Sequence, residues 1–210
     1  ANAASATAPG SAVFSSLNEA IAANAMDAVL IATPGKFHFA DLQSVLAAGV
    51  PTLCEKPLTP DAESALKIVE AEAAGGKKLI QVGFMRRFDP GYMELRDIVA
   101  AQPYGDLLAL RCQHRNPSVP ESYTNEMLIN DSVVHEIDAV RFITDSPIVA
   151  VDVKHLKRNK NNFSHLDDPI LAFLETESGV IADVEMNVSV RFGYQVKTEA
   201  VSYTHLRAHE

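Results

Sequence analysis

The chain has 210 residues, of which 47% are hydrophobic, so it can bury a sizeable core in one large domain or in one and a half ordinary ones. Its 18 Lys and Arg residues against 27 Asp and Glu residues give a formal net charge of -9, and neither sign forms a long block. This distribution argues against nucleic acid as a partner. No apolar run approaches the roughly 18 residues of a membrane span, so a membrane is not expected as a partner either.

The chain has two cysteines, Cys54 and Cys112, and both lie in apolar segments without metal-type spacing. That usage is typical of a reducing compartment rather than of a disulfide framework. The Ala-rich start lacks the basic leader of a signal peptide. The cytoplasm is therefore the expected location.

The first part of the chain alternates between helical and strand patterns. The apolar run over 27–34 ends in a proline, which is typical of a parallel strand buried on both faces. Thr59 is predicted to cap a helix that has Pro60 at its first position and Gly75 and Gly76 at its end. In chain order, the predicted elements are a helix over 16–25, a strand over 27–34, a helix over 39–48, a strand over 51–55, the helix after Thr59 and a strand over 78–84. This order predicts a doubly wound α/β sheet.

The pattern changes after Phe84. A helix is predicted over 92–101, a strand over 107–114 and a helix over 132–143, followed by several strands. Apolar and polar residues alternate over 180–190, which indicates a sheet with one covered face. The predicted fold is thus an incomplete Rossmann-type, doubly wound parallel sheet followed by an α+β domain with a mostly antiparallel sheet.

Two charges follow directly after a predicted strand, in Cys54-Glu55-Lys56-Pro57. Ligands bind beyond the carboxyl ends of strands in open parallel sheets, so the ammonium of Lys56 could hold a substrate oxygen there and favour negative charge on it. Pro57 would fix the chain direction, with a cis bond as one way to do so. The alternative is a strand-terminal ion pair between Glu55 and Lys56, without a role in binding.

A histidine flanked by carboxylates lies at the predicted start of the helix over 132–143. Asp131 is four residues before His135 and Asp138 is three residues after it, so all three can share one face. Such a histidine could accept a proton near neutral pH. In the alternative interpretation, Asp131 is the helix N-cap and His135 a half-buried ring. A metal site of Asp131 and His135, joined by His114, is a weaker reading, because no thiolate or second histidine has matching spacing.

Four motifs in order resemble the Gfo/Idh/MocA family of nicotinamide-dependent sugar oxidoreductases. They are Ala32-Thr33-Pro34 followed by His38, Cys54-Glu55-Lys56-Pro57, the segment from Gln81 to Pro90, and the segment from Asn130 to Asp138. The segments His114-Arg115-Asn116-Pro117 and Phe192-Gly193-Tyr194 favour the branch that acts on inositol. The resemblance covers approximately residues 27–201.

The resemblance implies an enzyme that oxidises a secondary hydroxyl of a cyclic polyol, inositol being the expected substrate, with NAD as cofactor and NADP not excluded. Residues 1–84 would be a partial dinucleotide-binding domain, residues 85–201 a partial substrate and oligomerisation domain, and the whole protein a homo-oligomer, a tetramer. His135 would be the base, Asp131 would orient it, and Lys56 would bind the reacting oxygen. The implied cofactor-binding residues are Thr33, Pro34, His38, Glu55, Lys56 and Met85, and the implied substrate-binding residues are Arg86, His114, Asn116, Asp138 and Tyr194. No metal is implied.

The sequence departs from the family pattern at both ends. It contains no Gly-x-Gly-x-x-Gly turn, so the ribose-reading acid that separates NAD from NADP is expected to lie upstream of it. Residues 202–210 match nothing expected there and are interpreted as a non-native tail. Three other functions stay open: a related sugar dehydrogenase or keto-sugar reductase, a non-catalytic sugar-binding subunit, and a metal hydrolase.

Overall fold

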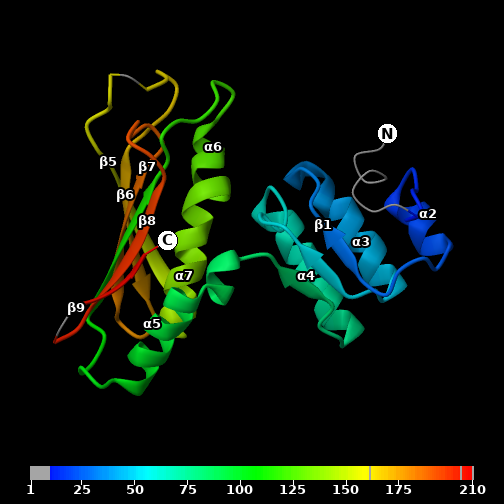
Figure 1. Cartoon of the computed structure of the whole chain (residues 1–210), viewed down its shortest axis with the longest axis horizontal. Coiled ribbons are helices and arrows are strands. Elements are labelled where there is room, and N and C mark those ends of the chain that lie inside the picture. The colour runs from blue at the N-terminus through cyan, green and yellow to red at the C-terminus, as the bar shows by residue number, and fades with distance from the viewer. Residues whose placement is uncertain (1–9, 161, 204, 210) are drawn as a thin grey trace. The chain divides into compact units, whose positions relative to one another are not determined.

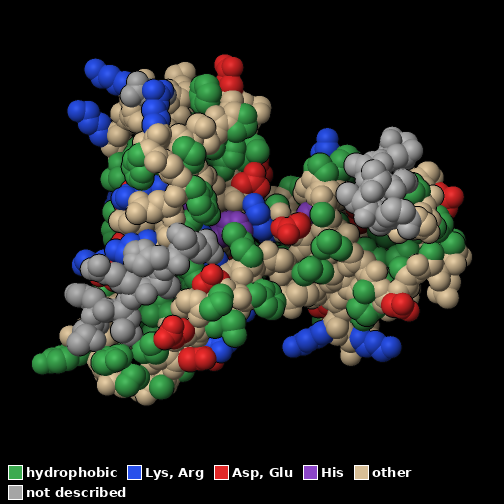
Figure 2. All heavy atoms as spheres, in the orientation of Figure 1, with side chains coloured by type: hydrophobic (Ala, Val, Ile, Leu, Met, Phe, Trp, Pro, Cys, Tyr) green, Lys and Arg blue, Asp and Glu red, His purple; other side chains and the backbone are tan. Residues whose placement is uncertain are grey.

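The computed structural model describes residues 10–160, 162–203 and 205–209, so the Ala-rich start over 1–7 lies outside the described residues. The chain divides into two compact units, Ala1–Gly83 and Phe84–Glu210 (Figure 1). Within the described ranges, no helix is long and apolar enough to cross a membrane. On the face shown in Figure 2, hydrophobic, acidic and basic side chains are interspersed.

The first unit is built around a three-stranded parallel sheet with the order β1-β2-β3. Leu30 of β1 is in register with Leu53 of β2, which in turn faces Gln81 of β3. The parallel order confirms the Rossmann-like arrangement predicted from the alternating pattern. The elements are α2 (Leu17–Ala22), β1 (Val29–Ile31), the 3-10 turn η1 (Gly35–Phe37), α3 (His38–Ala48), β2 (Thr52–Cys54), α4 (Ala62–Gly75) and β3 (Ile80–Val82).

Only one face of this sheet is covered within the described residues. Ile31 and Cys54 pack on that face against Leu42 and Val45 of α3 and Ile68 of α4. On the other face the side chain of Leu30 is 64% exposed and Leu53 is 43% exposed. The prediction of a strand buried on both faces is therefore wrong for the run over 27–34, because the helices pack on a single side.

The start of α4 also differs from the prediction. Asp61, not Thr59, is the N-cap, since its side chain accepts a hydrogen bond of 2.8 Å from the backbone N–H of Ser64. Thr59 instead donates its hydroxyl to the carbonyl of Asp61. The predicted end is correct, because Gly76 adopts the left-handed conformation, with φ of 67°, that ends many helices.

The second unit contains a six-stranded sheet with the order β5-β6-β7-β4-β8-β9. Strands β4 and β7 pair in parallel and the other neighbours pair antiparallel, which confirms the mostly antiparallel α+β prediction. The helical elements are η2 (Met85–Phe88), α5 (Pro90–Ala101), α6 (Asn125–Met127), the π-helical η3 (Leu128–Val133) and α7 (Val134–Thr144). The strands are β4 (Ala109–Arg115), β5 (Ile148–His155), β6 (Ile170–Thr176), β7 (Ile181–Asn187), β8 (Gln195–Val201) and β9 (His205–His209).

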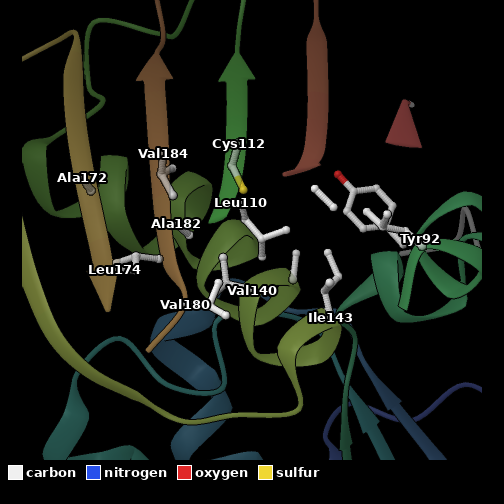
Figure 3. Close-up of a cluster of buried hydrophobic side chains, with 13 residues drawn as sticks. Tyr92, Leu110, Cys112, Val140, Ile143, Ala172, Leu174, Val180, Ala182 and Val184 are labelled. Atoms are coloured by element: carbon white, nitrogen blue, oxygen red, sulfur yellow. The ribbon is translucent and has the colours of Figure 1, made fainter. Parts of the chain in front are cut away.

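The core of the second unit lies between this sheet and the helices α5 and α7. Ala182, Val184 and Met186 of β7 are fully buried, as the alternating pattern predicts. Ala182 and Val184 share the core with Leu110 of β4 and Val140 of α7 (Figure 3), whereas Met186 belongs to a second buried cluster. Burial of this apolar face fixes the register of β4 and therefore the place of His114 along it.

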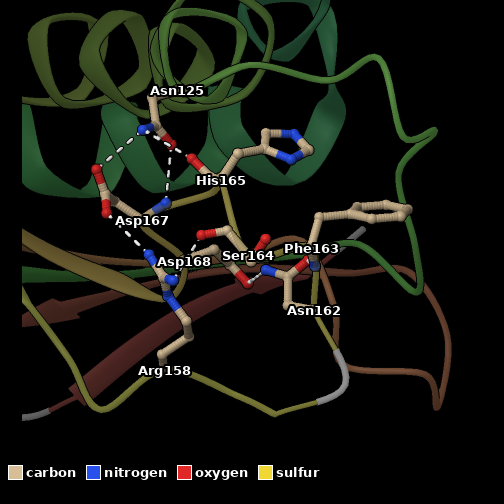
Figure 4. A network of polar contacts seen from close by, with 8 residues as sticks. All are labelled: Asn125, Arg158, Asn162, Phe163, Ser164, His165, Asp167 and Asp168. Atoms are coloured by element: carbon tan, nitrogen blue, oxygen red, sulfur yellow. Dashed lines mark hydrogen bonds and ion pairs between the residues drawn. The ribbon is translucent and has the colours of Figure 1, made fainter.

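A polar network orders the loop between β5 and β6 (Figure 4). Asp168 is 1% exposed and accepts hydrogen bonds from the side chain of Asn162, the backbone N–H of Val188 and the hydroxyl of Ser189. Burial raises the pKa of Asp168, and these three hydrogen bonds oppose that shift. The loop is thereby fastened to the end of β7.

The predicted non-native tail over 202–210 includes a strand. Its backbone, as β9, pairs antiparallel with β8, with Val201 opposite His205. Residues 204 and 210 lie outside the described residues.

Candidate functional site

In the first unit, the carboxyl ends of β1 and β2 lie beside each other. The backbone N–H of Glu55 donates to the carbonyl of Ile31 at 2.9 Å, and that of Gly83 donates to the carbonyl of Cys54 at 2.7 Å. A Cβ at Gly83 would lie 3.3 Å from Oε1 of Glu55 and 3.4 Å from the Cys54 carbonyl, so this position suits a glycine. The segments that begin with Ala32 and Glu55 therefore leave neighbouring strands at the same edge of the sheet.

His38 connects these two segments. Its Nε2 lies 2.7 Å from the carbonyl oxygen of Thr33 and its Nδ1 lies 2.8 Å from the carbonyl oxygen of Pro57. The ring is fully buried, with Sγ of Cys54 3.5 Å from Nδ1. Of the predicted cofactor-binding residues, His38 is thus placed to shape the strand-end segments rather than to present its side chain at the surface.

The other predicted cofactor-binding residues of this unit lie at the strand ends and remain accessible. Thr33, Pro34 and Glu55 are exposed and Lys56 is half-buried. The hydroxyl of Thr33 donates to Asp41 of α3 at 3.4 Å. The bond between Lys56 and Pro57 is cis. Met85, at the start of the second unit, is 45% exposed.

In the second unit, one long helical segment carries Asp131, His135 and Asp138. It begins at α6, where the side chain of Thr124 accepts a hydrogen bond from the backbone N–H of Met127, and continues through η3 into α7. The prediction of a helix that starts at Ser132, with Asp131 as the alternative N-cap, is therefore wrong. Asp131 lies inside a π-helical turn, which widens the spacing of side chains around the axis and often occurs at functional sites.

His135 lies in a group of aromatic rings. Its ring centroid is 6.4 Å from that of Phe84, edge-on, and 6.2 Å from that of His114 on β4. The ring of Tyr194 packs edge-on against His114 at 5.8 Å. The structure therefore brings the predicted base His135 together with two of the predicted substrate-binding residues, His114 and Tyr194.

The two consecutive arginines of η2 each pair with a carboxylate of α7. Nε and Nη2 of Arg87 donate hydrogen bonds to the two carboxylate oxygens of Asp138 at distances from 2.8 to 3.1 Å. This pairing raises the pKa of Arg87. Arg86 places Nη1 2.5 Å from Oε2 of Glu136, and both side chains are at most 2% exposed. Arg86 and Asp138, both predicted to bind substrate, thus contact charged partners inside the unit.

Asn116, the last of the predicted substrate-binding residues, follows β4. Its backbone N–H donates to the carbonyl of Asn187, and its carbonyl accepts from the backbone N–H of Val190. The residue is half-buried. These bonds extend the strand pairing of β4 just past its end, two residues beyond His114.

Glu136 is the residue that the sequence interpretation missed. Its carboxylate is 1% exposed and contacts both Arg86 and His114. A signal was present, because Ser132, Glu136 and Val140 recur at helical spacing on the buried face of the segment. A glutamate on such a face is almost never left without a partner.

Both cysteines are free and buried, and burial raises the pKa of Cys54 and of Cys112 to about 12, so both are thiols near neutral pH. Across the described residues there is no group of three or more His, Cys, Asp or Glu side chains that could hold a metal ion. The described residues therefore give no support to a metal site at Asp131 and His135.

Two family models match the chain. Residues 1–84 match the oxidoreductase family with an NAD-binding Rossmann fold, and residues 92–203 match the GFO/IDH/MocA C-terminal domain. Among curated relatives, the inositol 2-dehydrogenase of Leifsonia xyli is 56% identical over 202 residues, which cover 96% of this chain and 60% of the relative. That of Corynebacterium glutamicum ATCC 13032 is 57% identical over 201 residues, with the same coverage. The chain thus spans about 60% of the length of these relatives.

Solved structures agree with the sequence relatives. The myo-inositol dehydrogenase of Lactobacillus casei in complex with NAD(H) and myo-inositol has a TM-score of 0.89 at 33% identity, covering 94% of this chain and 59% of that one. A myo-inositol dehydrogenase of Corynebacterium glutamicum has a TM-score of 0.87 at 26% identity, covering 98% and 63%. The chain belongs to the Gfo/Idh/MocA family of oxidoreductases.

Proposed function

We propose that the protein carrying this chain is an NAD-dependent dehydrogenase that oxidises a secondary hydroxyl of inositol. The relatives that are more than half identical are named for this activity, and a similar solved structure holds NAD(H) and myo-inositol. The observation that carries the proposal within this chain is the grouping of His135 with His114 and Tyr194 in the second unit. That set offers a base and hydroxyl partners for a polyol.

The described residues fit one side of a dinucleotide site. Ligands of doubly wound sheets bind beyond the carboxyl ends of the strands, and β1 and β2 end beside each other there. Thr33, Glu55 and Lys56 follow directly and supply a hydroxyl, a carboxylate and an ammonium. NAD, when bound, would accept the hydride.

The remaining chemistry falls to side chains of the chain. A secondary alcohol holds its proton far above neutral pH, so oxidation needs a base to remove it and a cation to stabilise the oxygen. In the proposal, His135 takes the hydroxyl proton, and Lys56 is the cation that the family resemblance implies. Asp131 supports the positive charge that His135 acquires, as the family resemblance implies.

The test is steady-state kinetics on the product of the whole gene, assayed for NAD reduction with a panel of inositols and hexoses. Replacing His135 by Asn should lower kcat by about 10²- to 10⁴-fold, the usual contribution of a general base, while the circular dichroism spectrum is unchanged. His155→Asn, at an exposed position of β5, is the matched control and should keep full activity. Full activity of the His135→Asn variant would contradict the assignment, and oxidation of a hexose but not of inositol would assign the protein to another sugar.

A further inference from the structure

Glu136 is a buried carboxylate with a separate partner for each oxygen. Nη1 of Arg86 lies 2.5 Å from Oε2, and Nδ1 of His114 lies 3.1 Å from Oε1. No side chain of the three is more than 4% exposed. The three come from η2, β4 and α7 of the second unit, so residues distant in sequence meet inside a single compact unit.

The donors and acceptors of this group determine where protons lie. A guanidinium only donates and an ionised carboxylate only accepts, so Arg86 occupies Oε2 and leaves Oε1 for the imidazole. The nitrogen of His114 that faces Oε1 must therefore carry a hydrogen. The contact meets the distance of a hydrogen bond but not its angle, so its formation requires a small rotation of the ring.

Glu136 remains ionised in this environment. Burial alone would raise its pKa, but the contacts with His114 and Arg86 outweigh burial and hold the pKa of Glu136 below its usual value. The adjacent guanidinium also balances the negative charge. The ion pair of Arg86 and Glu136 can therefore accept a hydrogen bond at Oε1 without leaving an uncompensated buried charge.

We propose that Glu136, supported by Arg86, is a positioning residue that holds His114 in the tautomer with the hydrogen on Nδ1. This proposal rests on the proposed function. In that tautomer Nε2 carries a lone pair and accepts a hydrogen bond from a polyol hydroxyl, while the same ring contacts those of His135 and Tyr194. An acceptor nitrogen binds a hydroxyl but not a keto oxygen, so His114 favours the alcohol over a ketone at that position.

The tautomer can be measured directly by NMR. With ¹⁵N-labelled histidine, the two ring nitrogens of each histidine give shifts that report which one is protonated. His114→Asn identifies the His114 signals, because the asparagine amide can still donate to Glu136 in place of Nδ1. We expect His114 of the parent protein, without substrate, to carry its hydrogen on Nδ1. A hydrogen on Nε2 would overturn the proposal.

Glu136→Gln sharpens the test because the amide has one acceptor and one donor end. Arg86, which only donates, should take the amide oxygen, so the NH₂ group is left facing His114. That ring must then accept through Nδ1 and move its hydrogen to Nε2, which reverses the tautomer. An unchanged tautomer in a folded variant would show that Glu136 does not set it.

A second variant covers the case in which Glu136→Gln does not fold. The double substitution Arg86→Met with Glu136→Met removes both buried charges together, which proteins often tolerate. In this double variant His114 should lose its preference for the Nδ1–H tautomer, so that both tautomers are populated. Retention of a single Nδ1–H tautomer there would contradict the role of Glu136.

Kinetics separate this proposal from the proposed function. In Glu136→Gln the KM for inositol should rise about tenfold, the value of one lost hydrogen bond, while the KM for NAD is unchanged. An equal rise in both KM values would indicate a merely structural role. If the parent protein oxidised no inositol, the proposed function would fail, whereas the tautomer measurement would still decide the role of Glu136.

Discussion

The two units hold their site residues in different ways. In the first unit, Lys56 follows a strand of three residues, and the strand-end segments are connected mainly by backbone hydrogen bonds and by His38. In the second unit, His114 contacts the buried ion pair of Glu136 and Arg86, and it lies on a six-stranded sheet with an extensive core. The comparison teaches that the residues proposed to bind the polyol are held by buried side chains of the second unit, whereas those proposed to bind the cofactor are held largely by the main chain of the first unit.

The largest effect should follow from breaking the charge network of the second unit. Glu136→Ala leaves the guanidinium of Arg86 buried without its carboxylate, so we expect a loss of about 3–5 kcal/mol in the free energy of unfolding. The chain has no tryptophan, and all five tyrosines lie in the second unit. Urea unfolding followed by tyrosine fluorescence therefore reports on that unit.

The matched control for Glu136→Ala is Asp152→Ala. Asp152 pairs with Lys154 on β5, and both side chains are 60% exposed, so its removal should change stability by less than about 1 kcal/mol. If the two variants lost the same free energy of unfolding, the buried ion pair would contribute no more to stability than an exposed one.

A smaller effect is expected from the corresponding connection in the first unit. In His38→Gln a shorter amide replaces a ring whose two nitrogens each contact a carbonyl, so one of the carbonyls of Thr33 and Pro57 loses its contact. We expect a cost of about 1–2 kcal/mol, because one buried carbonyl loses its partner. Hydrogen exchange measured by mass spectrometry on peptides from 29–58 should show faster exchange in that segment.

Gln43→Ala serves as the control for His38→Gln, because Gln43 is exposed on the same helix α3. Its exchange should match that of the parent. If His38→Gln also left the exchange of 29–58 unchanged, the main chain alone would hold the strand ends and the role given to His38 would be withdrawn.

Periodicity predicted most of the fold because packing follows it. The position of α3 and the one-sided burial of β7 both follow regular apolar spacing, because side chains at that spacing share one face and are buried together. The parallel strands were predicted from continuous apolar runs and from their alternation with helices. The cap of α4 was misplaced by two residues because Thr59 and Asp61 both suit an N-cap, and the sequence alone does not choose between them.

The candidate site was less accessible to sequence reasoning. A π-helical turn adds a residue to the turn, so a pattern of 3.6 residues could not show that Asp131 lies inside the helix. The contacts of Glu136 with Arg86 and His114 join positions 50 and 22 residues away, and no local pattern encodes them. The motifs therefore predicted which residues gather in the second unit, but not which of them support the others.

The most direct measurement of the proposed oxidation is isotope transfer. The whole protein would be given NAD and myo-inositol that carries deuterium on the carbon of the 2-hydroxyl, and the NADH formed would be analysed by mass spectrometry. We predict that each NADH carries one deuterium, and that the His135→Asn variant forms labelled NADH far more slowly. NADH without deuterium, or loss of the label to water, would contradict direct hydride transfer from that carbon.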